Sequence, residues 1–225
     1  MSKRKRIMVT CPACGKEAPF VMWDSINTEI DPEMKAAVRD ASAFRFICPE
    51  CGNIANVDYQ TLYHQMEDKI MIYYVHEDEV EDVCKMFTGN GEDDPIKQFR
   101  LEGYLHRVVT SQRELIEKLA IFDAGLDDRI IEIAKVLVMA LVRRDFPAMK
   151  GCRAFFTREG NTNEIVVMSS DGRQCCSELK DDIYGNFVRD YGESLGKLRG
   201  SYPIVNQAWA ADFLDLERGW AGTTA

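Results

Sequence analysis

A short cysteine motif that occurs twice is the strongest constraint on this chain. Cys-Pro-Ala-Cys-Gly at residues 11–15 recurs as Cys-Pro-Glu-Cys-Gly at residues 48–52. Two residues between the cysteines let both sulfurs bind one ion from a single tight turn, and the following glycine accepts backbone conformations that other residues resist. Two such turns supply four thiolates, the full ligand set of a tetrahedral metal site. The sequence therefore predicts one metal site formed by Cys11, Cys14, Cys48 and Cys51.

The cellular compartment decides whether paired cysteines bind metal or form disulfides. A secretory signal needs an apolar stretch of about 7–15 residues, whereas three apolar residues separate the basic run at 3–6 from Cys11. The most apolar region, residues 130–142, contains Glu132 and Lys135 and is shorter than the roughly 20 residues that cross a bilayer. We therefore expect a cytoplasmic protein with no membrane partner, in which thiols stay reduced and paired cysteines bind metal.

The ligand chemistry indicates both the ion and its role. Four thiolates complete the tetrahedron that zinc prefers and leave no position for water or substrate, so the predicted site is structural rather than catalytic. Structural Zn²⁺ is the predicted cofactor, and iron, which such sites also bind, is the alternative. The other four of the eight cysteines lack the paired spacing and are interpreted as free thiols rather than a second metal site: Cys84, Cys152, Cys175 and Cys176.

The segment between the two motifs must contain structure of its own. It has 33 residues, which exceeds the usual spacing of roughly 15–20 between such pairs. The Asp31-Pro32 pair is typical of a helix start, because proline at the first helical position has a suitable φ and no N–H to lose. The predicted elements are strands at 20–23 and 44–47, a helix over 34–41 and, after the second motif, a strand at 69–75.

The rest of the chain has the pattern of helices and a β meander. Ser111 and Glu114 form a capping-box signature before a helix that ends near Gly125, and Asp127 can cap a longer helix to residue 144. Apolar residues occur on nearly every side of the longer helix, which predicts that it is buried. Further predicted elements are a strand at 101–109, strands at 153–158, 164–169 and 173–176, a helix capped by Ser177 and a final helix from Asn206.

Together these elements predict an α+β fold. An N-terminal zinc-ribbon-like β module with an inserted helix would be followed by a helical hairpin, an antiparallel β meander and C-terminal helices. The predicted domains are residues 1–75, an acidic connecting segment at 76–100 and residues 101–225. Strand pairing across the connecting segment would instead join both halves into one unit.

The net charge of −9 is concentrated in one segment. Residues 76–94 contain eight acidic residues against Lys85, whereas residues 1–60 carry eight charges of each sign. We interpret the acidic segment as solvated helix and loop, with an acidic patch for a basic partner as the alternative. Calcium is disfavoured because the alternating acidic residues of a calcium loop are absent.

Nucleic acid is the less favoured class of partner. Residues 3–6, Lys-Arg-Lys-Arg, form a basic cluster, but a net-acidic chain repels phosphates, and the balanced module has no broad basic face. The aromatic residues near the motifs alternate with other residues in strand-like runs, so we expect them in the core rather than stacked on bases.

No convincing catalytic set is present in the sequence. Residues 192–196 fit the G-x-S-x-G pattern, but a nucleophile elbow needs a strand before the serine and a histidine after it. A helix-like segment precedes Ser194, and no histidine follows His106. His64, His76 and His106 are scattered along the chain. The sequence therefore names no catalytic residue and leans against an enzyme.

Several stretches resemble the bacterial CpXC domain family. They are the two Cys-Pro-x-Cys motifs and the runs at 20–27, 31–33, 44–52, 55–59 and 62–64. The resemblance covers about residues 8–130 and includes all four family cysteines, at 11, 14, 48 and 51. It implies a zinc-binding domain of bacterial proteins whose biochemical role is uncharacterised, and it supplies no activity. His64 lies in a family-like stretch and is the histidine for which a role stays open.

The expected function follows from a closed metal site, an acidic segment and no catalytic set. We expect a zinc-stabilised bacterial protein that acts as a protein-interaction or scaffold module, with a homo-oligomer as one form of partner. A nucleic-acid-binding zinc-ribbon protein is the alternative. An unrecognised enzyme is the next, and its signature would be a pocket lined by several perturbed titratable groups.

Overall fold

The computed structural model describes residues 2–88, 102–198 and 203–222, with side chains to residue 215. The chain divides into two compact units. The first extends to Ile116 and includes Pro203, and the second begins at Glu117, so the division falls inside helix α4 (Gln112–Asp123). The described residues combine helices with mixed sheets, which confirms the predicted α+β class.

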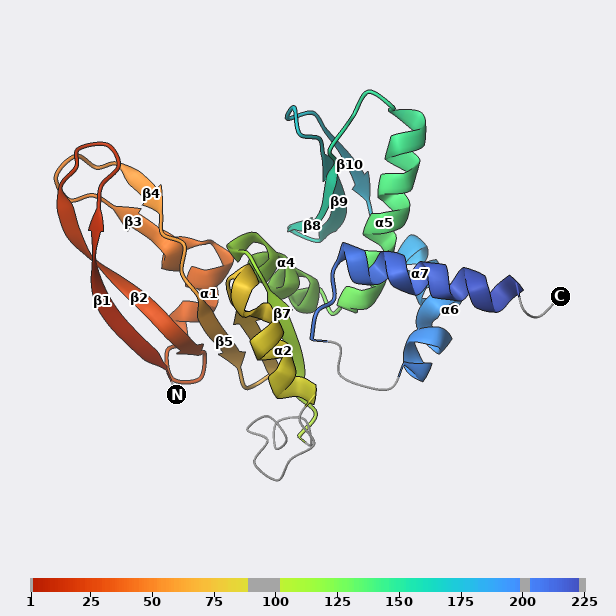
Figure 1. Cartoon of the computed structure of the whole chain (residues 1–225), viewed down its shortest axis with the longest axis horizontal. Helices are drawn as coiled ribbons and strands as arrows, with labels where there is room; N and C mark the ends of the chain where they lie inside the picture. The colour runs from red at the N-terminus through yellow and green to blue at the C-terminus, as the bar shows by residue number, and fades with distance from the viewer. Residues whose placement is uncertain (1, 89–101, 199–202, 223–225) are drawn as a thin grey trace. The chain divides into compact units, whose positions relative to one another are not determined.

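The first unit is built on a five-stranded mixed sheet with the order β1-β2-β5-β6-β7 (Figure 1). The strands are β1 (Lys3–Thr10), β2 (Glu17–Asn27), β5 (Thr61–Gln65), β6 (Ile70–Tyr74) and β7 (Leu105–Val109). β1 with β2 and β5 with β6 are antiparallel, whereas β2 with β5 and β6 with β7 are parallel. A separate two-stranded ribbon and short helices complete the unit: β3 (Arg45–Ile47), β4 (Ile54–Asn56), α1 (Glu33–Arg39), η1 (Ser42–Phe44), η2 (Glu77–Glu79) and α2 (Val80–Thr88).

Most elements predicted for the first unit are confirmed, with shifted ends. The strands at 20–23 and 69–75 are β2 and β6. The predicted helix is α1, which begins directly after Pro32. The strand predicted at 44–47 begins at Arg45 because Phe44 closes a 3₁₀ turn. β7 begins at Leu105, and residue 101, where it was predicted to start, lies outside the described residues.

An aromatic cluster packs the β3–β4 ribbon onto the rest of the first unit. The Tyr59 ring centroid lies 4.9 Å from that of Phe44 and 6.0 Å from that of Phe20. The Tyr59 hydroxyl donates to the carbonyl oxygen of Ala43 at 2.9 Å, so this buried polar group is satisfied. Phe46 of β3 is also buried. Apolar burial therefore fixes the ribbon at the end next to Phe44. This cluster does not fix the opposite end, the turn between β3 and β4.

Helix α1, inserted between the two cysteine motifs, is anchored to the sheet by polar contacts. The guanidinium of Arg39 donates to the Tyr63 hydroxyl at 2.9 Å and to the Gln65 side-chain oxygen at 3.1 Å. Tyr63 donates to the same Gln65 oxygen at 2.7 Å. Met34 and Val38 on the inner face of the helix are buried. The insertion is therefore an ordered part of the unit.

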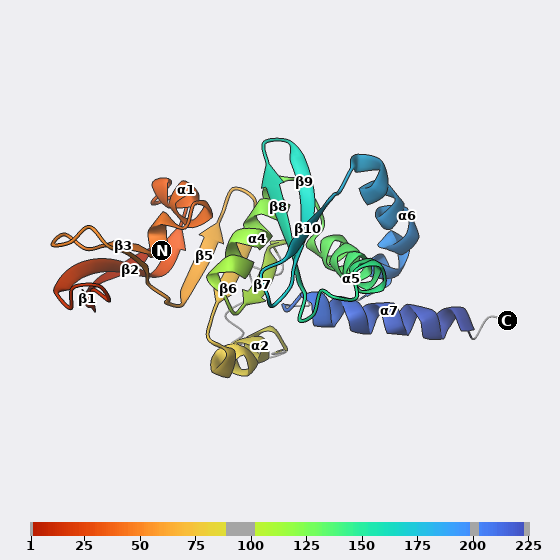
Figure 2. The same cartoon turned by 90° about the horizontal axis from the view of Figure 1, so that it is seen from above.

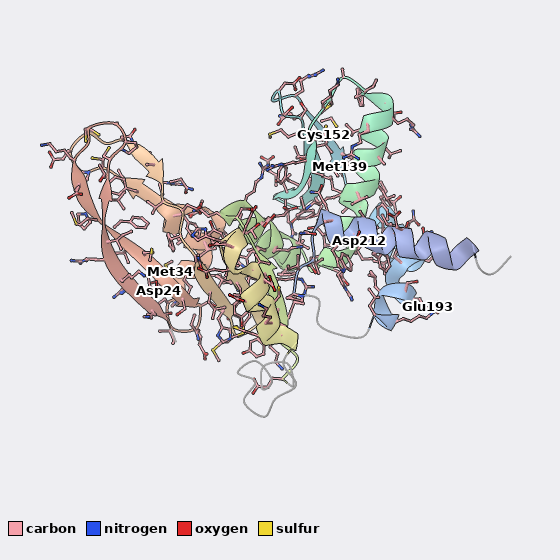
Figure 3. The ribbon with its side chains drawn as sticks, in the orientation of Figure 1. Asp24, Met34, Met139, Cys152, Glu193 and Asp212 are labelled. Atoms are coloured by element: carbon pink, nitrogen blue, oxygen red, sulfur yellow. The ribbon has the colours of Figure 1, made fainter. Side chains whose placement is uncertain are left out.

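Asp24 gives the β1–β2 hairpin a pH-dependent contact. Asp24 lies on β2 (Figure 3), and its carboxylate is 2.9 Å from the ammonium of Lys5 and 3.5 Å from that of Lys3. The hydrogen bond from Lys5 and the positive charges of both lysines lower the pKa of Asp24 below its ordinary 3.8, against the opposing effect of burial. A lowered folded-state pKa stabilises the fold above the unfolded-state pKa, and this contribution is lost as the pH falls through the folded-state value.

We therefore expect Asp24→Asn to lower the free energy of unfolding by up to about 1 kcal/mol at pH 7. The difference from wild type should shrink towards zero between pH 4 and the lowered pKa. Urea denaturation of both proteins across this range measures it, with Glu159→Gln on an exposed strand end as the control. A difference that stays constant with pH would refute the charge-based explanation.

The second unit packs helices against a three-stranded antiparallel sheet (Figure 2). Its strands, in the order β10-β9-β8, are β8 (Arg153–Glu159), β9 (Thr162–Met168) and β10 (Gln174–Glu178), which confirms the predicted meander. α5 (Asp128–Asp145) contacts β8 and β9 as well as α6 (Asp181–Lys197) and α7 (Gln207–Gly222). Apolar side chains of α5 meet Ile165 and Val167 of β9 in one core cluster and Phe213 and Leu214 of α7 in another.

Two predicted helix caps, Ser111 and Asp127, are confirmed and one, Ser177, is wrong, whereas Asn206 caps the predicted final helix without having been predicted as a cap. The Asp127 carboxylate accepts from the Arg129 N–H at 2.9 Å, and the Asn206 side chain accepts from the Trp209 N–H at 3.0 Å. Ser111 accepts from the Glu114 N–H at 3.2 Å. Ser177 caps no helix, because it pairs with Ile165 as part of β10, and α6 begins after Lys180 instead.

The first half of helix α5 is buried, as was predicted for the whole helix, whereas residues 140, 141 and 143–145 are exposed. The buried half also contains charge that was not predicted. Lys118 of α4 lies 3.0 Å from both Asp128 and Glu132, and Lys135 lies 2.8 Å from Glu117 and 2.9 Å from Glu132. All five side chains are buried. Backbone groups take part, since Phe156 donates its N–H to Glu117 at 2.7 Å and Lys118 donates to the carbonyl of Val205 at 2.6 Å. We call these five side chains the buried ion cluster.

The predicted domain boundaries stay a prediction. Strand β7 comes from the predicted second domain, and it pairs in parallel with β6 of the first. Strand pairing therefore spans the acidic segment at residues 76–100, as the one-unit alternative requires.

Candidate metal centre

The first cysteine motif forms the turn between β1 and β2. The Cys11 N–H donates to the Lys16 carbonyl at 2.8 Å, and the Gly15 N–H donates to the Cys11 carbonyl at 2.9 Å. Gly15 has φ +70°, a left-handed conformation that side chains with a Cβ resist. The glycine of the motif is therefore required by the turn.

The second motif forms the turn between β3 and β4 with the same geometry. The Cys48 N–H donates to the Asn53 carbonyl at 2.9 Å, the Gly52 N–H donates to the Cys48 carbonyl at 2.9 Å, and Gly52 has φ +72°. The sequence repeat is thus a structural repeat, and two equivalent turns present their cysteines to each other.

The four cysteine sulfurs converge on one point. All four Sγ atoms lie within 4.8 Å of one another. Between the turns, Cys11 Sγ lies 3.7 Å from Cys51 Sγ, and Cys14 Sγ lies 3.6 Å from Cys48 Sγ. A tetrahedral ion with sulfur ligands at about 2.3 Å places its sulfurs about 3.8 Å apart. The spacing therefore fits a single tetrahedral ion, and this cluster can hold a metal.

The first cysteine of each turn faces inward and the second faces outward. Cys11 and Cys48 are each 1% exposed, whereas Cys14 and Cys51 lie at the surface. A bound ion would therefore be shielded on one side and reachable by a chelator on the other.

The thiols perturb each other's ionisation. The backbone N–H of Cys14 donates to the Cys11 sulfur, and with further help from the Ala13 N–H and the neighbouring thiols it lowers the pKa of Cys11 to about 6 against the effect of burial. For Cys14 the Lys16 N–H acts in the same direction, but desolvation and the other three thiols outweigh it and raise the pKa to about 12.

Cys51 behaves like Cys14. The Asn53 N–H and the Cys14 thiol favour its thiolate, but desolvation and the thiols of Cys11 and Cys48 raise its pKa. Without a cation the cluster thus favours one thiolate whose charge is shared by neighbouring S–H groups. A divalent cation supplies the positive charge that lets all four cysteines become thiolates.

Four sulfur atoms are a complete ligand set for one tetrahedral ion. A fourth sulfur occupies the position that a catalytic site keeps open for water or substrate. The four ligands come from two separate hairpins, β1–β2 in the five-stranded sheet and β3–β4 in the ribbon. An ion at this point would join elements that belong to different sheets.

The other cysteines lie away from this cluster. Cys84 is half-buried in α2, and burial raises its pKa. Cys152 and Cys175 pack against the second unit's core beside Met139 and Val167, and burial raises the pKa of Cys175. Cys176 is exposed on β10. These four side chains are free thiols in the structure.

The remaining sequence candidates are spread over the fold. His64 on β5 is buried, its Nε2 lies 3.2 Å from the Tyr104 hydroxyl, and burial lowers its pKa. His106 on β7 is buried among aromatic rings, including those of Tyr73 and Phe87. Ser194 lies inside α6 and not at the strand-to-helix turn that a nucleophile elbow needs.

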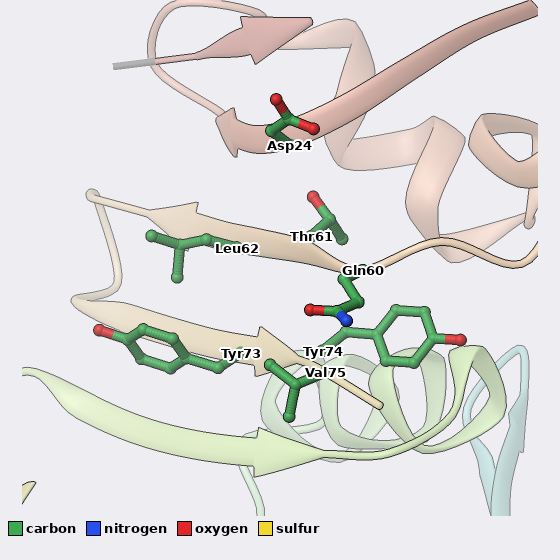
Figure 4. Close-up of a pocket in the computed structure, with 7 residues that line it drawn as sticks. All are labelled: Asp24, Gln60, Thr61, Leu62, Tyr73, Tyr74 and Val75. Carbon is green, nitrogen blue, oxygen red and sulfur yellow. The ribbon is translucent and has the colours of Figure 1, made fainter. Parts of the chain in front are cut away.

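A small pocket opens beside β5 and β6 (Figure 4). Its volume is about 230 Å³, and its lining residues are Asp24, Gln60, Thr61, Leu62, Tyr73, Tyr74 and Val75. Most polar groups of the lining already have partners: Asp24 pairs with the lysines of β1, Gln60 donates to Glu79, and the Tyr74 hydroxyl donates to Asp58. Burial raises the pKa of Tyr73 to about 12, so its phenol stays neutral. The lining provides no nucleophile–base pair.

The structure brings together two groups of residues that were not predicted from the sequence. One is the buried ion cluster, for which the i, i+3 spacing of Glu132 and Lys135 was the available signal. The other is the strand formed by the basic residues 3–6, which lies at the edge of the first sheet. Within the described residues, no helix combines the length and apolar character that a membrane crossing needs.

The comparisons with known proteins agree with the metal centre. The family model described as CpXC protein matches residues 9–135, which is more than half of the chain and includes both cysteine turns. Neither the curated proteins nor the solved structures contain a match to this chain. The matched region contains the four converging cysteines. The chain therefore belongs to the CpXC protein family.

Proposed function

We propose that Cys11, Cys14, Cys48 and Cys51 bind one structural zinc ion, and that the module held by this ion binds another protein. The observation that carries the proposal is the convergence of four sulfurs from two equivalent turns. Four thiolates suit Zn²⁺, which has no redox chemistry of its own and prefers a tetrahedral site. Iron bound by the same four sulfurs is the alternative that metal analysis distinguishes.

The proposed role of the ion is to fix the two hairpins as one rigid surface. The β3–β4 ribbon is packed by the aromatic cluster at one end, and the ion would hold its turn at the other. Structural zinc contributes about 10–16 kcal/mol of apparent binding free energy that is coupled to folding. A small module with few other contacts would depend on this contribution.

Exposed apolar side chains beside the second turn support protein binding. Ile47 and Ile54 face each other across β3 and β4 and are 60% and 63% exposed. Met8 on β1 is exposed to the same extent. Exposed β-branched residues in a cross-strand pair add nothing to a core, whereas a partner that covers them removes apolar surface from water.

A photo-crosslinking experiment tests the proposal. We expect a photoreactive phenylalanine analogue at position 54 to crosslink the full-length protein to another protein in the cells that produce it. The same analogue at Leu141, an exposed residue of α5, is the matched control and should give no such product. The purified protein should contain about one zinc ion per chain.

Two results would refute the proposal in separate ways. Adducts at position 54 that disappear on nuclease treatment, or the same adducts at both positions, would exclude a protein partner at this surface. A purified protein that contains iron, or no metal while its cysteine turns remain ordered, would exclude the structural zinc ion.

A further inference from the structure

Strand β1 forms an open edge of the five-stranded sheet. In the part of the chain that the structure describes, β1 pairs with β2 on one side and with no strand on the other. Figure 1 shows it as the outer strand of its sheet. An edge strand of eight residues presents backbone N–H and C=O groups that another extended chain can pair with.

The side chains of β1 change character halfway along the strand. Its first four residues are basic and exposed: Lys3, Arg4, Lys5 and Arg6. The next three residues are apolar: Ile7, Met8 and Val9. Successive side chains point to opposite faces of a strand, so the basic half carries positive charge on both faces.

The basic side chains are held along the strand by contacts within the first unit. Lys3 and Lys5 share one carboxylate, that of Asp24 on β2. The guanidinium of Arg4 lies 5.5 Å from the ring centroid of Trp23. Asp24 offsets one of the four positive charges, so the edge keeps a net excess of positive charge.

Basic residues on an edge strand normally prevent association with other edges. They do so against neutral strands and against a second copy of the same strand, because like charges opposite each other are destabilising. An acidic strand reverses this effect, since the Cβ atoms of directly opposite residues would lie about 4.5–5.5 Å apart and opposite charges at that spacing attract. The edge of β1 should therefore disfavour neutral and basic strands and accept an acidic one.

We propose that β1 binds an acidic, extended segment of a partner protein, which adds to the sheet as a further strand. Acidic residues of the segment lie opposite residues 3–6 of β1 and apolar residues lie opposite residues 7–9. Backbone hydrogen bonds supply affinity and the two halves of the strand set the register. This inference rests on the proposed protein-binding function and names the chemistry of the partner.

A nucleic acid could bind the positive charge of β1, but it could not pair with the backbone edge of the strand. Phosphates neutralise lysine and arginine side chains. A phosphate backbone has no alternating N–H and C=O groups to pair with a strand, and it gains nothing from the apolar half of β1. A peptide uses both halves of the strand and its free backbone edge.

Two fluorescent octapeptides probe the edge in both strand directions. Thr-Val-Val-Ile-Glu-Asp-Glu-Asp matches antiparallel addition and Glu-Asp-Glu-Asp-Ile-Val-Val-Thr matches parallel addition. We expect full-length, zinc-loaded protein to bind one of them in a fluorescence anisotropy titration. A peptide of equal composition with acidic and apolar residues alternating should bind about tenfold more weakly, because its charges fall opposite the apolar half.

Charge reversal in β1 locates the site. The Arg4→Glu/Arg6→Glu double variant should weaken peptide binding by about tenfold or more, whereas Arg143→Glu on α5 should leave it unchanged. Because Arg4 contacts Trp23, Arg6→Glu alone is a second variant that leaves this contact in place. Zinc content and circular dichroism of each variant must match those of wild type.

N-methylation of the peptide separates strand addition from simple charge attraction. Alternate backbone N–H groups of an added strand point towards β1 and the others point away. Methylating one alternate set should abolish binding and methylating the other set should not. Equal binding of both methylated peptides, or binding of a twelve-residue single-stranded oligothymidylate in place of the peptides, would overturn the proposal.

The outcomes distinguish this inference from the proposed function. Crosslinking at position 54 together with failure of both octapeptides would remove the β1 site and leave protein binding through the ribbon surface intact. Peptide binding that depends on β1, with no crosslink at position 54, would support the strand site and reject the ribbon surface. Failure of both experiments would reject protein binding altogether.

Discussion

Replacing Cys14 with serine, or removing the metal with a strong chelator, is expected to unfold the first third of the chain. Serine is a far weaker zinc ligand than a thiolate, and structural zinc contributes about 10–16 kcal/mol to such modules. This exceeds or equals the total stability of about 5–15 kcal/mol that a folded domain usually has. Hydrogen exchange followed by mass spectrometry should show loss of protection over β1 to β5.

The topology explains why the effect should be so large. The β1–β2 hairpin and the β3–β4 ribbon belong to different sheets and share no backbone ladder. Their described connection away from the cysteines is the packing of Phe20 and Phe44 on Tyr59. Without the ion, the ribbon keeps one anchored end and loses the other.

The control for this prediction is another cysteine of the same unit. Cys84→Ser in α2 removes a half-buried thiol at a distance from the cluster and should leave metal content and protection unchanged. An unaltered melting curve after verified removal of the metal would show that the cysteine turns fold without an ion. The proposed structural role would then be wrong.

The second large effect is expected from the buried ion cluster. Lys135→Met should lower the free energy of unfolding by about 3–5 kcal/mol, because removing one member of a buried ion pair leaves uncompensated charge in the core. Lys135 contacts both Glu117 and Glu132. Urea denaturation measures the change, and Arg143→Met on the exposed side of α5 is the control.

Glu117→Gln should be far milder, because it removes a buried negative charge and keeps the size and the hydrogen-bonding oxygen of the side chain. Three carboxylates face two ammonium groups, so these five side chains carry an excess of negative charge when all of them are ionised. Burial, reinforced by the charge of Glu132, raises the pKa of Glu117 despite the favourable charge of Lys135. The glutamine oxygen can still accept from Lys135 and from the Phe156 N–H.

The explanation also predicts how the free energy of unfolding of wild type and of Glu117→Gln changes with pH. A carboxyl group with a raised folded-state pKa costs stability as the pH rises from its unfolded-state value through the folded-state value. Wild type should show this decrease above about pH 4.5, the ordinary pKa of glutamate, and Glu117→Gln should lack it. A loss for Glu117→Gln as large as that for Lys135→Met would show that Glu117 is ionised in the core.

Local chemistry was predictable from the sequence where it depends on neighbours along the chain. The spacing within 11–15 and 48–52 predicted two equivalent turns and their convergence. Asp127 and Ser111 act as helix caps as predicted, because a cap needs only the next few residues. The α+β class followed from the order of these local patterns.

Pairing between distant segments was not predictable in the same way. Ser177 has a good cap composition, but its backbone pairs with Ile165, and that ladder extends the strand past the predicted helix start. Glu132 and Lys135 interrupt an apolar pattern, and nothing local indicates that Lys118 and Glu117 will meet them in the core. The basic residues 3–6 were interpreted by charge alone, whereas β2 makes them a strand.

The order of the strands has a consequence for synthesis on the ribosome. Both cysteine turns lie within the first 53 residues, whereas β5, β6 and β7 complete the sheet only by residue 109. The parallel pairs β2–β5 and β6–β7 join segments that are far apart in sequence, and such pairs form slowly. An ion captured by the emerging chain would close the loop between the turns first. The nascent module would then present a fixed β2 on which the later strands assemble.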